Sequence, residues 1–322
     1  MRLYMMLAFF FLAAAISGAF AQTEAPPNAN EEKTIFYSDR FIFRGEDIDD
    51  LHMVLMAFER GGDSEKKYGE FFGAVFEKSQ WSFFEGNDKY RFVETDLTVI
   101  QPSYYAAADG TASSGFILKY DAGDYTLKIS SGPVRRIYTP NNGVTLKKTI
   151  GIAEAVLSIH GKKYWGDLIY ESLLWNGFDG LMRYKHLYKE YQGFYLKSEA
   201  GKLIYFHQNK ADQNAFKNTH HLPETLQSEG GVILQKDHIV HTFKSPIPIT
   251  ALKKKTPPLA FYKVPQRWQV DTSPEAGRLF LWSRGEASKN WVTGGYYVMA
   301  IEGIVKAGTQ EERVWGFAEY YP

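Results

Sequence analysis

Residues 121–133 are Asp-Ala-Gly-Asp-Tyr-Thr-Leu-Lys-Ile-Ser-Ser-Gly-Pro, and they show on a small scale how the whole chain is patterned. Between Tyr125 and Ile129, apolar and polar side chains alternate, which is typical of a strand with one buried face. Turn-forming residues stand on both sides, at Asp121–Asp124 and at Ser131–Pro133. The segment therefore predicts a short strand between two turns.

The same pattern recurs along the chain. Ala200-Gly201 lies between two aromatic runs and indicates a tight hairpin turn. Residues 179–192 carry Leu181 and Tyr184 at helical spacing, but the same stretch is also compatible with an irregular strand and loop. Many short strands with frequent turns favour a barrel or sandwich. The other expected strands are Leu51–Phe58, Ala155–Ile159, Phe194–Leu196, Leu203–Phe206, Val232–Leu234, Leu279–Trp282, Tyr296–Val305 and Val314–Tyr321.

Composition narrows the range of partners. The 322 residues contain 37 basic and 37 acidic side chains, and 16% of the residues are aromatic. Nucleic-acid binding requires concentrated positive charge, and the densest basic run, Lys253–Lys255, is followed by prolines and predicts a solvated loop. Aromatic residues favour strands and line apolar cavities. We therefore expect a hydrophobic small molecule or lipid as the partner, and no nucleic acid.

The first 21 residues have the features of a cleavable signal peptide. Arg2 precedes an apolar run from Met5 to Ile16, and Ser17–Ala21 has the small residues of a cleavage site. The run is shorter than the about 20 residues that span a bilayer, and no later segment is apolar enough for an integral span. Residues 22–33 are expected to be a flexible leader. The absence of cysteine suits a bacterial periplasm, so we expect a periplasmic or secreted protein.

The sequence contains no familiar catalytic or metal-binding signature. The GxSxG nucleophile elbow, the GxGxxG fingerprint, the phosphate-binding loop and HExxH are all absent. The closest histidine set is His220, His221, His238 and His241. Positions 238 and 241 would face opposite sides of a strand, so we expect no metal site and no cofactor.

Acidic residues beside aromatic ones offer a better lead at residues 164–180. If this stretch is a strand, Trp165, Asp167 and Glu171 share one face with Ile169 and Leu173. In a pocket, desolvation would raise the pKa of at least one carboxyl group and leave a neutral acid able to donate a proton. If the face points to water instead, both carboxylates are ordinary solvated charges. Both readings remain open at this stage.

Several segments resemble the AttH-like and carotenoid 1,2-hydratase (hydroxyneurosporene synthase) superfamily, whose members pair two lipocalin-like β-barrels. The resemblance follows the family's order over most of the chain after the leader. It rests on Ile35–Tyr37 with Leu51–Arg60, on Ala155–Glu171, on Pro265–Trp268, on Tyr296–Gly303 and on Gly316–Tyr320.

One motif departs from that family. Where the family usually has Trp-x-Asp-His/Arg-x-Trp, this chain has Ile169-Tyr-Glu-Ser-Leu-Leu-Trp175. The acid has become Glu171, its basic neighbour has become Ser172, and the tryptophan has moved by one position. The departure argues against retained hydratase chemistry and leaves the pair of barrels in place.

The resemblance implies a mainly β fold of two antiparallel lipocalin-like β-barrels packed together, covering residues 34–157 and 158–322. The leading hypothesis is an exported binding protein for a hydrophobic ligand such as a lipid or isoprenoid. The alternatives are a hydratase or isomerase-type enzyme that uses acid catalysis on an apolar substrate, and an envelope interaction scaffold without a small ligand. The sequence assigns neither a specific ligand nor an oligomeric state.

Candidate residues follow from these hypotheses. Glu171 would be the acid, supported by Asp167. Glu319, on a strand face with three aromatic residues, is expected to pair with an arginine such as Arg267. The expected ligand-binding residues are Trp165, Tyr170, Trp175, Tyr184 and Trp268.

Overall fold

The computed structural model describes residues 35–62, 67–84, 89–90, 97–123, 125–139, 146–176, 188–211, 229–236, 238–244, 246–257, 262–272, 276–284, 291–293 and 296–321. Within these ranges every regular element is a β-strand, apart from short turns. No helix in the described ranges is long and apolar enough to cross a membrane. All the described residues belong to one unit, Lys33–Pro322. The mainly β prediction is therefore confirmed.

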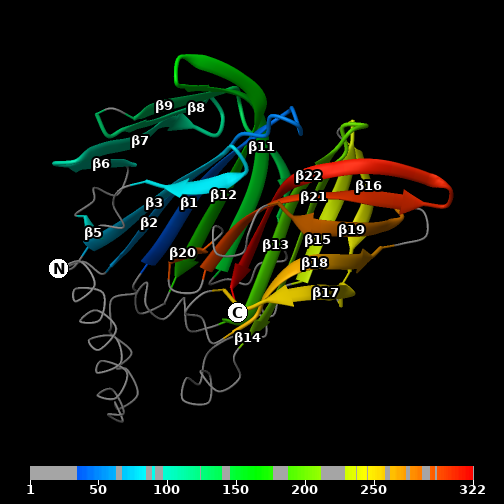
Figure 1. The fold of residues 1–322 in the computed structure, drawn as a ribbon. Coiled ribbons are helices and arrows are strands. Elements are labelled where there is room, and N and C mark those ends of the chain that lie inside the picture. Colours follow the sequence, from blue (N-terminus) through cyan, green and yellow to red (C-terminus); the bar gives the residue numbers. More distant parts are fainter. Residues whose placement is uncertain are drawn as a thin grey trace, which may run out of the picture. The chain divides into compact units, whose positions relative to one another are not determined.

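The first sheet is antiparallel, with the order β4-β3-β2-β1-β12-β11-β9-β8-β7-β6 (Figure 1). In addition, β5 pairs with β3 and β10 pairs with β11. The strands are β1 (Ile35–Gly45), β2 (Met53–Gly62), β3 (Lys67–Glu77), β4 (Gln80–Phe83), β5 (Lys89–Tyr90), β6 (Thr98–Gln101), β7 (Tyr104–Thr111), β8 (Gly115–Asp121), β9 (Thr126–Ser131), β10 (Arg135–Tyr138), β11 (Leu146–Ile159) and β12 (Lys162–Asn176).

The second sheet is also antiparallel, with the order β16-β15-β14-β13-β22-β21-β19-β18-β17, and β20 pairs with β21. Its strands are β13 (Tyr188–Ser198), β14 (Leu203–Ala211), β15 (Glu229–Gln235), β16 (His238–Phe243), β17 (Ile249–Lys255), β18 (Val264–Asp271), β19 (Arg278–Ser283), β20 (Trp291–Thr293), β21 (Tyr296–Ala307) and β22 (Gln310–Tyr321).

Each sheet curls until distant strands touch across its concave face. In the first sheet, the rings of Phe41 on β1 and Phe116 on β8 lie 4.9 Å apart, although three strands separate β1 from β8 in the sheet order. In the second, Phe194 on β13 meets Trp268 on β18 at 5.5 Å across a similar separation. Rings that pack edge to face at such distances stabilise the curvature.

Strand alternation distributes the apolar side chains over three layers. One fills the interior of the first sheet and contains Phe41, Phe43 and Leu168. A second fills the interior of the second sheet around Trp268. The third combines residues of both sheets, with Ile42 and Ile169 from the first against Tyr195, Tyr205 and Phe317 from the second. The third layer is the interface between the sheets.

The chain passes between the sheets later than the expected division after residue 157. That position lies in β11, whose hairpin with β12 belongs wholly to the first sheet. The passage falls between Asn176 and Tyr188. The hairpin inserts beside β1, because Arg40 pairs with Glu171 and Gly45 with Gly166 in the register. A side chain at Gly166 would meet the backbone oxygen of Arg44 at 2.1 Å, so glycine permits this close approach.

Candidate functional site

The interface between the sheets contains a buried polar cluster. We use the name inter-sheet cluster for Arg40, Glu59, Lys148 and Glu171 of the first sheet with Tyr191, Tyr195, Tyr205, His207 and Glu319 of the second. β1 and β12 deliver Arg40 and Glu171 as register partners on the same face as Ile42 and Ile169. On the other side, β22 presents Glu319 beside Phe317.

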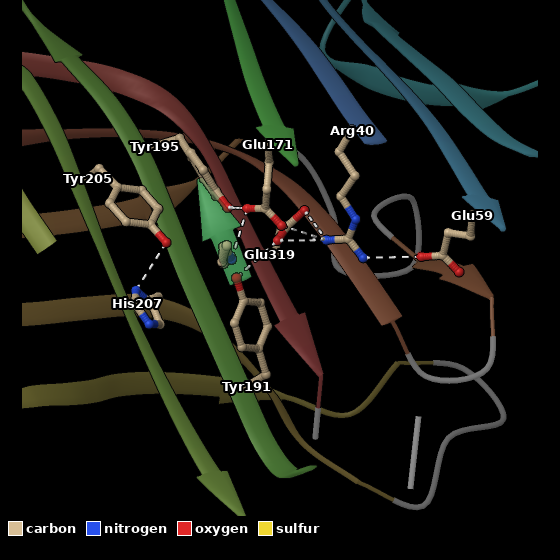
Figure 2. Close-up of polar contacts among 9 residues, drawn as sticks. Arg40, Glu59, Glu171, Tyr191, Tyr195, Tyr205, His207 and Glu319 are labelled. Carbon is tan, nitrogen blue, oxygen red and sulfur yellow. Dashed lines mark hydrogen bonds and ion pairs between the residues drawn. The ribbon is translucent and has the colours of Figure 1, made fainter. Parts of the chain in front are cut away.

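Arg40 is the central cation of the inter-sheet cluster (Figure 2). Its Nη1 lies 3.2 Å from Glu319 Oε1 and 3.9 Å from Glu171 Oε1, and its Nη2 lies 3.5 Å from Glu59 Oε1. The Glu319 side chain is completely buried, and a buried carboxylate requires such a partner. The expected ion pair of Glu319 with an arginine is confirmed, but the partner is Arg40 and not Arg267. Arg267 is exposed on β18, whereas Arg40 reaches Glu319 from the other sheet.

Glu171 is held in its ionised form. Lys148 Nζ lies 2.9 Å from Glu171 Oε2, and the Tyr195 hydroxyl donates to the same oxygen at 2.6 Å. Burial alone would raise the pKa of this carboxyl group, but Lys148 and Arg40 outweigh burial and lower the pKa to about 2. The expectation that desolvation leaves Glu171 as a neutral proton donor is not met here, because two cations accompany the carboxylate into the interface.

The neutral members of the cluster come from the second sheet. Burial, followed by the charges of Glu171 and Glu319, raises the pKa of Tyr191 and Tyr195 well above the ordinary value, so both hydroxyls keep their protons. The Tyr205 hydroxyl lies 3.0 Å from Nδ1 of His207. Burial and the charge of Lys148 lower the pKa of His207 to about 3, so its imidazole is neutral at physiological pH.

A second charged group lies on the same face of β12. Asp167 accepts hydrogen bonds from Arg44 Nη2 at 2.9 Å and from Lys197 Nζ at 3.0 Å. Burial raises the pKa of Asp167, but the two cations outweigh burial and lower it overall. Asp167 and Glu171 therefore share the face that alternation predicts, and each is paired with cations there.

The structure separates the predicted ligand-binding residues. Trp165 is 69% exposed. Tyr170 faces the interior of the first sheet, and Trp268 is buried in the interior of the second. The side chain of Trp175 and the whole of Tyr184 lie outside the described residues. The three that the structure describes, Trp165, Tyr170 and Trp268, therefore lie in three separate places.

Sequence reasoning missed Arg40, Lys148, Tyr195 and His207. The alternation of Arg40, Ile42 and Arg44 along one face of β1 was the available signal for the first of these. Lys148 and Tyr195 meet Glu171 from other strands, so the local pattern around them does not identify this partner. His207 has Tyr205 two residues away on the same strand, and this spacing was a signal. Among the described residues, no group of three or more histidine, aspartate and glutamate side chains has the arrangement to hold a metal ion.

An open hollow of about 400 Å³ lies elsewhere, at the ends of β8, β9 and β11. Its lining includes Lys119, Tyr120, Leu127 and His160, and none of the inter-sheet cluster. The strongest convergence of buried polar groups therefore does not coincide with this hollow.

Solved structures share this fold. NE1406 of Nitrosomonas europaea, assigned as an AttH protein, has a TM-score of 0.57 at 10% identity, covering 94% of this chain and 98% of that chain. Kievitone hydratase of Nectria haematococca has a TM-score of 0.51 at 14% identity, covering 94% and 92%. CghA with Sch210972 has a TM-score of 0.52 at 10% identity, covering 93% of each chain. No family model and no curated sequence matches the chain. The fold is thus the AttH-like, lipocalin-like fold.

Proposed function

We propose that this protein is an enzyme of the hydratase or isomerase type that acts on a largely apolar substrate at the inter-sheet cluster. The observation that carries the proposal is the contact between the Tyr195 hydroxyl and Glu171 Oε2 at 2.6 Å, with Lys148 on the same oxygen. A neutral donor and an ionised acceptor share one hydrogen bond away from bulk water, where electrostatic effects are strong.

The roles differ from those expected from the sequence. Glu171 is a weak base, but the oxonium ion formed when water adds to a carbocation is a strong acid and gives up its proton to a weak base. The same carboxylate stabilises positive charge that develops on a substrate beside it. Tyr195 keeps its proton and donates a hydrogen bond to the substrate. In hydration, water supplies both groups that add across the double bond, and its hydroxyl goes to one carbon. The proton that water loses passes through Glu171 to the other carbon, which leaves Glu171 ionised again.

One further observation supports the proposal. Kievitone hydratase, a hydratase by name, has the same fold. We also propose membership of the AttH-like and carotenoid 1,2-hydratase superfamily, from the order of the motifs given above.

We propose in addition that the protein is exported to the periplasm. N-terminal sequencing of the exported protein is expected to begin at Gln22, and retention of Met1 would contradict export by cleavage.

The test begins with the natural ligand. Native mass spectrometry of protein purified from its own cells identifies the compound that co-purifies. Incubation with that compound in H₂¹⁸O is expected to give a product heavier by one labelled water for a hydratase. In D₂O, a product that has gained deuterium but no water indicates an isomerase. Tyr195→Phe and Glu171→Gln are expected to lower the rate by about 100-fold or more and to retain binding.

Glu312→Gln is the matched control, because Glu312 is also paired with a lysine, Lys202, at 2.7 Å, but lies outside the inter-sheet cluster. It is expected to keep the wild-type rate. If the wild-type protein binds the compound but incorporates neither ¹⁸O nor deuterium into it, the proposal of an enzyme is contradicted.

That last outcome would favour the second candidate, a binding protein for a hydrophobic ligand. The observation in its favour is the aromatic interior of the first sheet, where Phe71, Tyr104 and Tyr120 stack on one another. Such surfaces bind apolar ligands with a few polar groups for orientation.

A further inference from the structure

The interior face of the first sheet carries a polar triad formed by Asp39, Arg60 and Tyr170. The Tyr170 hydroxyl donates to Asp39 Oδ1 at 2.6 Å, and Arg60 Nη2 forms an ion pair with Asp39 Oδ2. Strand alternation places the triad on the face opposite to Arg40 and Glu171, because Asp39 and Tyr170 precede those two residues directly. The triad is thus separate from the inter-sheet cluster, on the other side of the same strands.

The surroundings of the triad are apolar and aromatic. Asp39 and Arg60 are each 7% exposed, and the Tyr170 ring stacks on Phe41 at 5.1 Å and lies 4.9 Å from Phe116. Burying such an ion pair costs free energy that a hydrophobic substitute would not. Of the three residues, Arg60 lies near a strand end, two residues before β2 ends at Gly62.

The second sheet shows that the fold does not require charges at this place. β1 and β13 are both 11 residues long, and both pair with the last long strand of their sheet. The fifth residue is Asp39 in β1 and Gln192 in β13. Gln192 donates to Gln208 at 3.0 Å, a neutral pair on the face that also carries Phe194. At the equivalent position of the second sheet, two neutral amide side chains therefore form a hydrogen bond without any charge.

We infer that the Asp39–Arg60–Tyr170 triad is a ligand site that binds the hydroxyl group of a neutral, largely apolar alcohol inside the first sheet. A hydroxyl group donates and accepts, which matches the carboxylate acceptor of Asp39 beside the guanidinium donor of Arg60, while the Tyr170 phenol orients the carboxylate. Burial, together with Asp39, raises the pKa of Tyr170, so the phenol keeps its proton. The charge of Asp39 disfavours a carboxylate ligand. This inference goes beyond the proposed function and does not depend on it.

The test compares two probes that differ only at the polar end, 1-decanol and its methyl ether. The wild-type protein is expected to bind decanol about tenfold more tightly, as for one hydrogen bond of about 1.4 kcal/mol. Tyr170→Phe is expected to reduce this ratio to about two or less, because Asp39 loses the phenol that orients its carboxylate toward the ligand. Calorimetry measures both affinities without any turnover, so the result is separate from that of the enzymatic assay.

Tyr125→Phe is the matched control. Tyr125 packs against the same interior layer, and in the described part of the chain its hydroxyl has no hydrogen-bond partner. It is expected to keep the tenfold ratio. Near-UV circular dichroism reports whether each variant folds, and Arg60→Lys replaces Tyr170→Phe if that variant does not. Equal affinity for the two probes, binding of neither, or an unchanged ratio in the folded triad variant would overturn the inference.

Discussion

Each of the two sheets buries a carboxylate at their interface, but the residues beside the two carboxylates differ. In the first sheet, β12 carries Glu171 with Arg40 as its register partner on β1. In the second, β22 carries Glu319 with Gly193 as its register partner on β13. Arg40 and Gly193 are each the sixth residue of an 11-residue strand. The two carboxylates therefore occupy equivalent places, but the register partner is an arginine in the first sheet and a glycine in the second.

This difference makes the second sheet dependent on the first. Glu319 is completely buried and takes its ion pair from Arg40, across the interface. In return the second sheet supplies Tyr191 and Tyr195, whose hydroxyls donate to Glu319 at 3.3 Å and to Glu171 at 2.6 Å. A side chain at Gly193 would meet the Tyr191 hydroxyl at 2.7 Å, so glycine at this position makes room for the donor. Each sheet therefore supplies a polar partner to the buried carboxylate of the other sheet.

The largest effect is expected from Arg40→Gln. The substitution removes the guanidinium that pairs with the completely buried Glu319 across the interface, and breaking a buried ion pair costs about 3–5 kcal/mol. Urea unfolding measures the loss. The double variant Arg40→Gln with Glu319→Gln is expected to recover a large part of it, because the orphaned charge is then absent. A loss below about 1 kcal/mol for the single variant would show that Glu319 does not depend on Arg40.

The pH dependence of stability separates the two sheets further. The pKa of Glu171 is lowered from 4.5 to about 2, so its ionised form stabilises the folded state by about 3 kcal/mol. This stabilisation is complete above pH 4.5 and is lost as the pH falls towards 2. In Glu171→Gln the free energy of unfolding should fall less steeply over this window. Identical slopes for the variant and the wild type would contradict the ionised state of Glu171.

His207 is expected to act in a higher window. Its pKa is lowered from 6.5 to about 3, so below pH 6.5 the unfolded chain binds a proton that the folded chain does not. Stability should therefore fall by about 1.4 kcal/mol per pH unit as the pH drops below 6.5. As the pH falls from 6.5 to 4.5, the loss of stability due to His207 therefore begins before the loss due to Glu171. His207→Gln should flatten it, and imidazole ¹⁵N shifts at pH 5 should show a neutral ring. A protonated ring at that pH would refute the assignment.

Two tyrosine variants compare the hydroxyls that the second sheet donates. Tyr195→Phe removes the 2.6 Å bond to Glu171 and is expected to cost about 1.5–3 kcal/mol, as for hydrogen bonds to charged groups. Tyr191→Phe removes the longer bond to Glu319 and should cost less, because Arg40 already neutralises that carboxylate. Chemical denaturation of both variants measures the difference, and the reverse order would mean that Glu319 relies on its phenol more than on Arg40.

The smallest effect is expected at Trp165, away from the inter-sheet cluster. Its side chain is 69% exposed, so Trp165→Ser should change the free energy of unfolding by less than about 0.5 kcal/mol. Ligand binding should also be unchanged, in contrast to the role that the sequence suggests for this residue. Weaker binding of the co-purifying compound by this variant would show that Trp165 takes part in ligand binding.

The amino-acid sequence was enough to predict the fold class and the faces of the strands. Alternation of apolar and polar residues is a local property, and it placed Asp167 and Glu171 on one face of β12. The order of the motifs was sufficient to expect the AttH-like fold that the solved structures share.

The tertiary structure alone decided which charges meet. Glu319 lies 279 positions from Arg40, and nothing in the local pattern of either strand identifies the other as its partner. The same holds for the ionised state of Glu171, because a pKa is set by every charge around a buried group. Here those charges arrive on β1 and β11. Local pattern fixes which way a side chain points, and only the packing of two sheets fixes what it meets there.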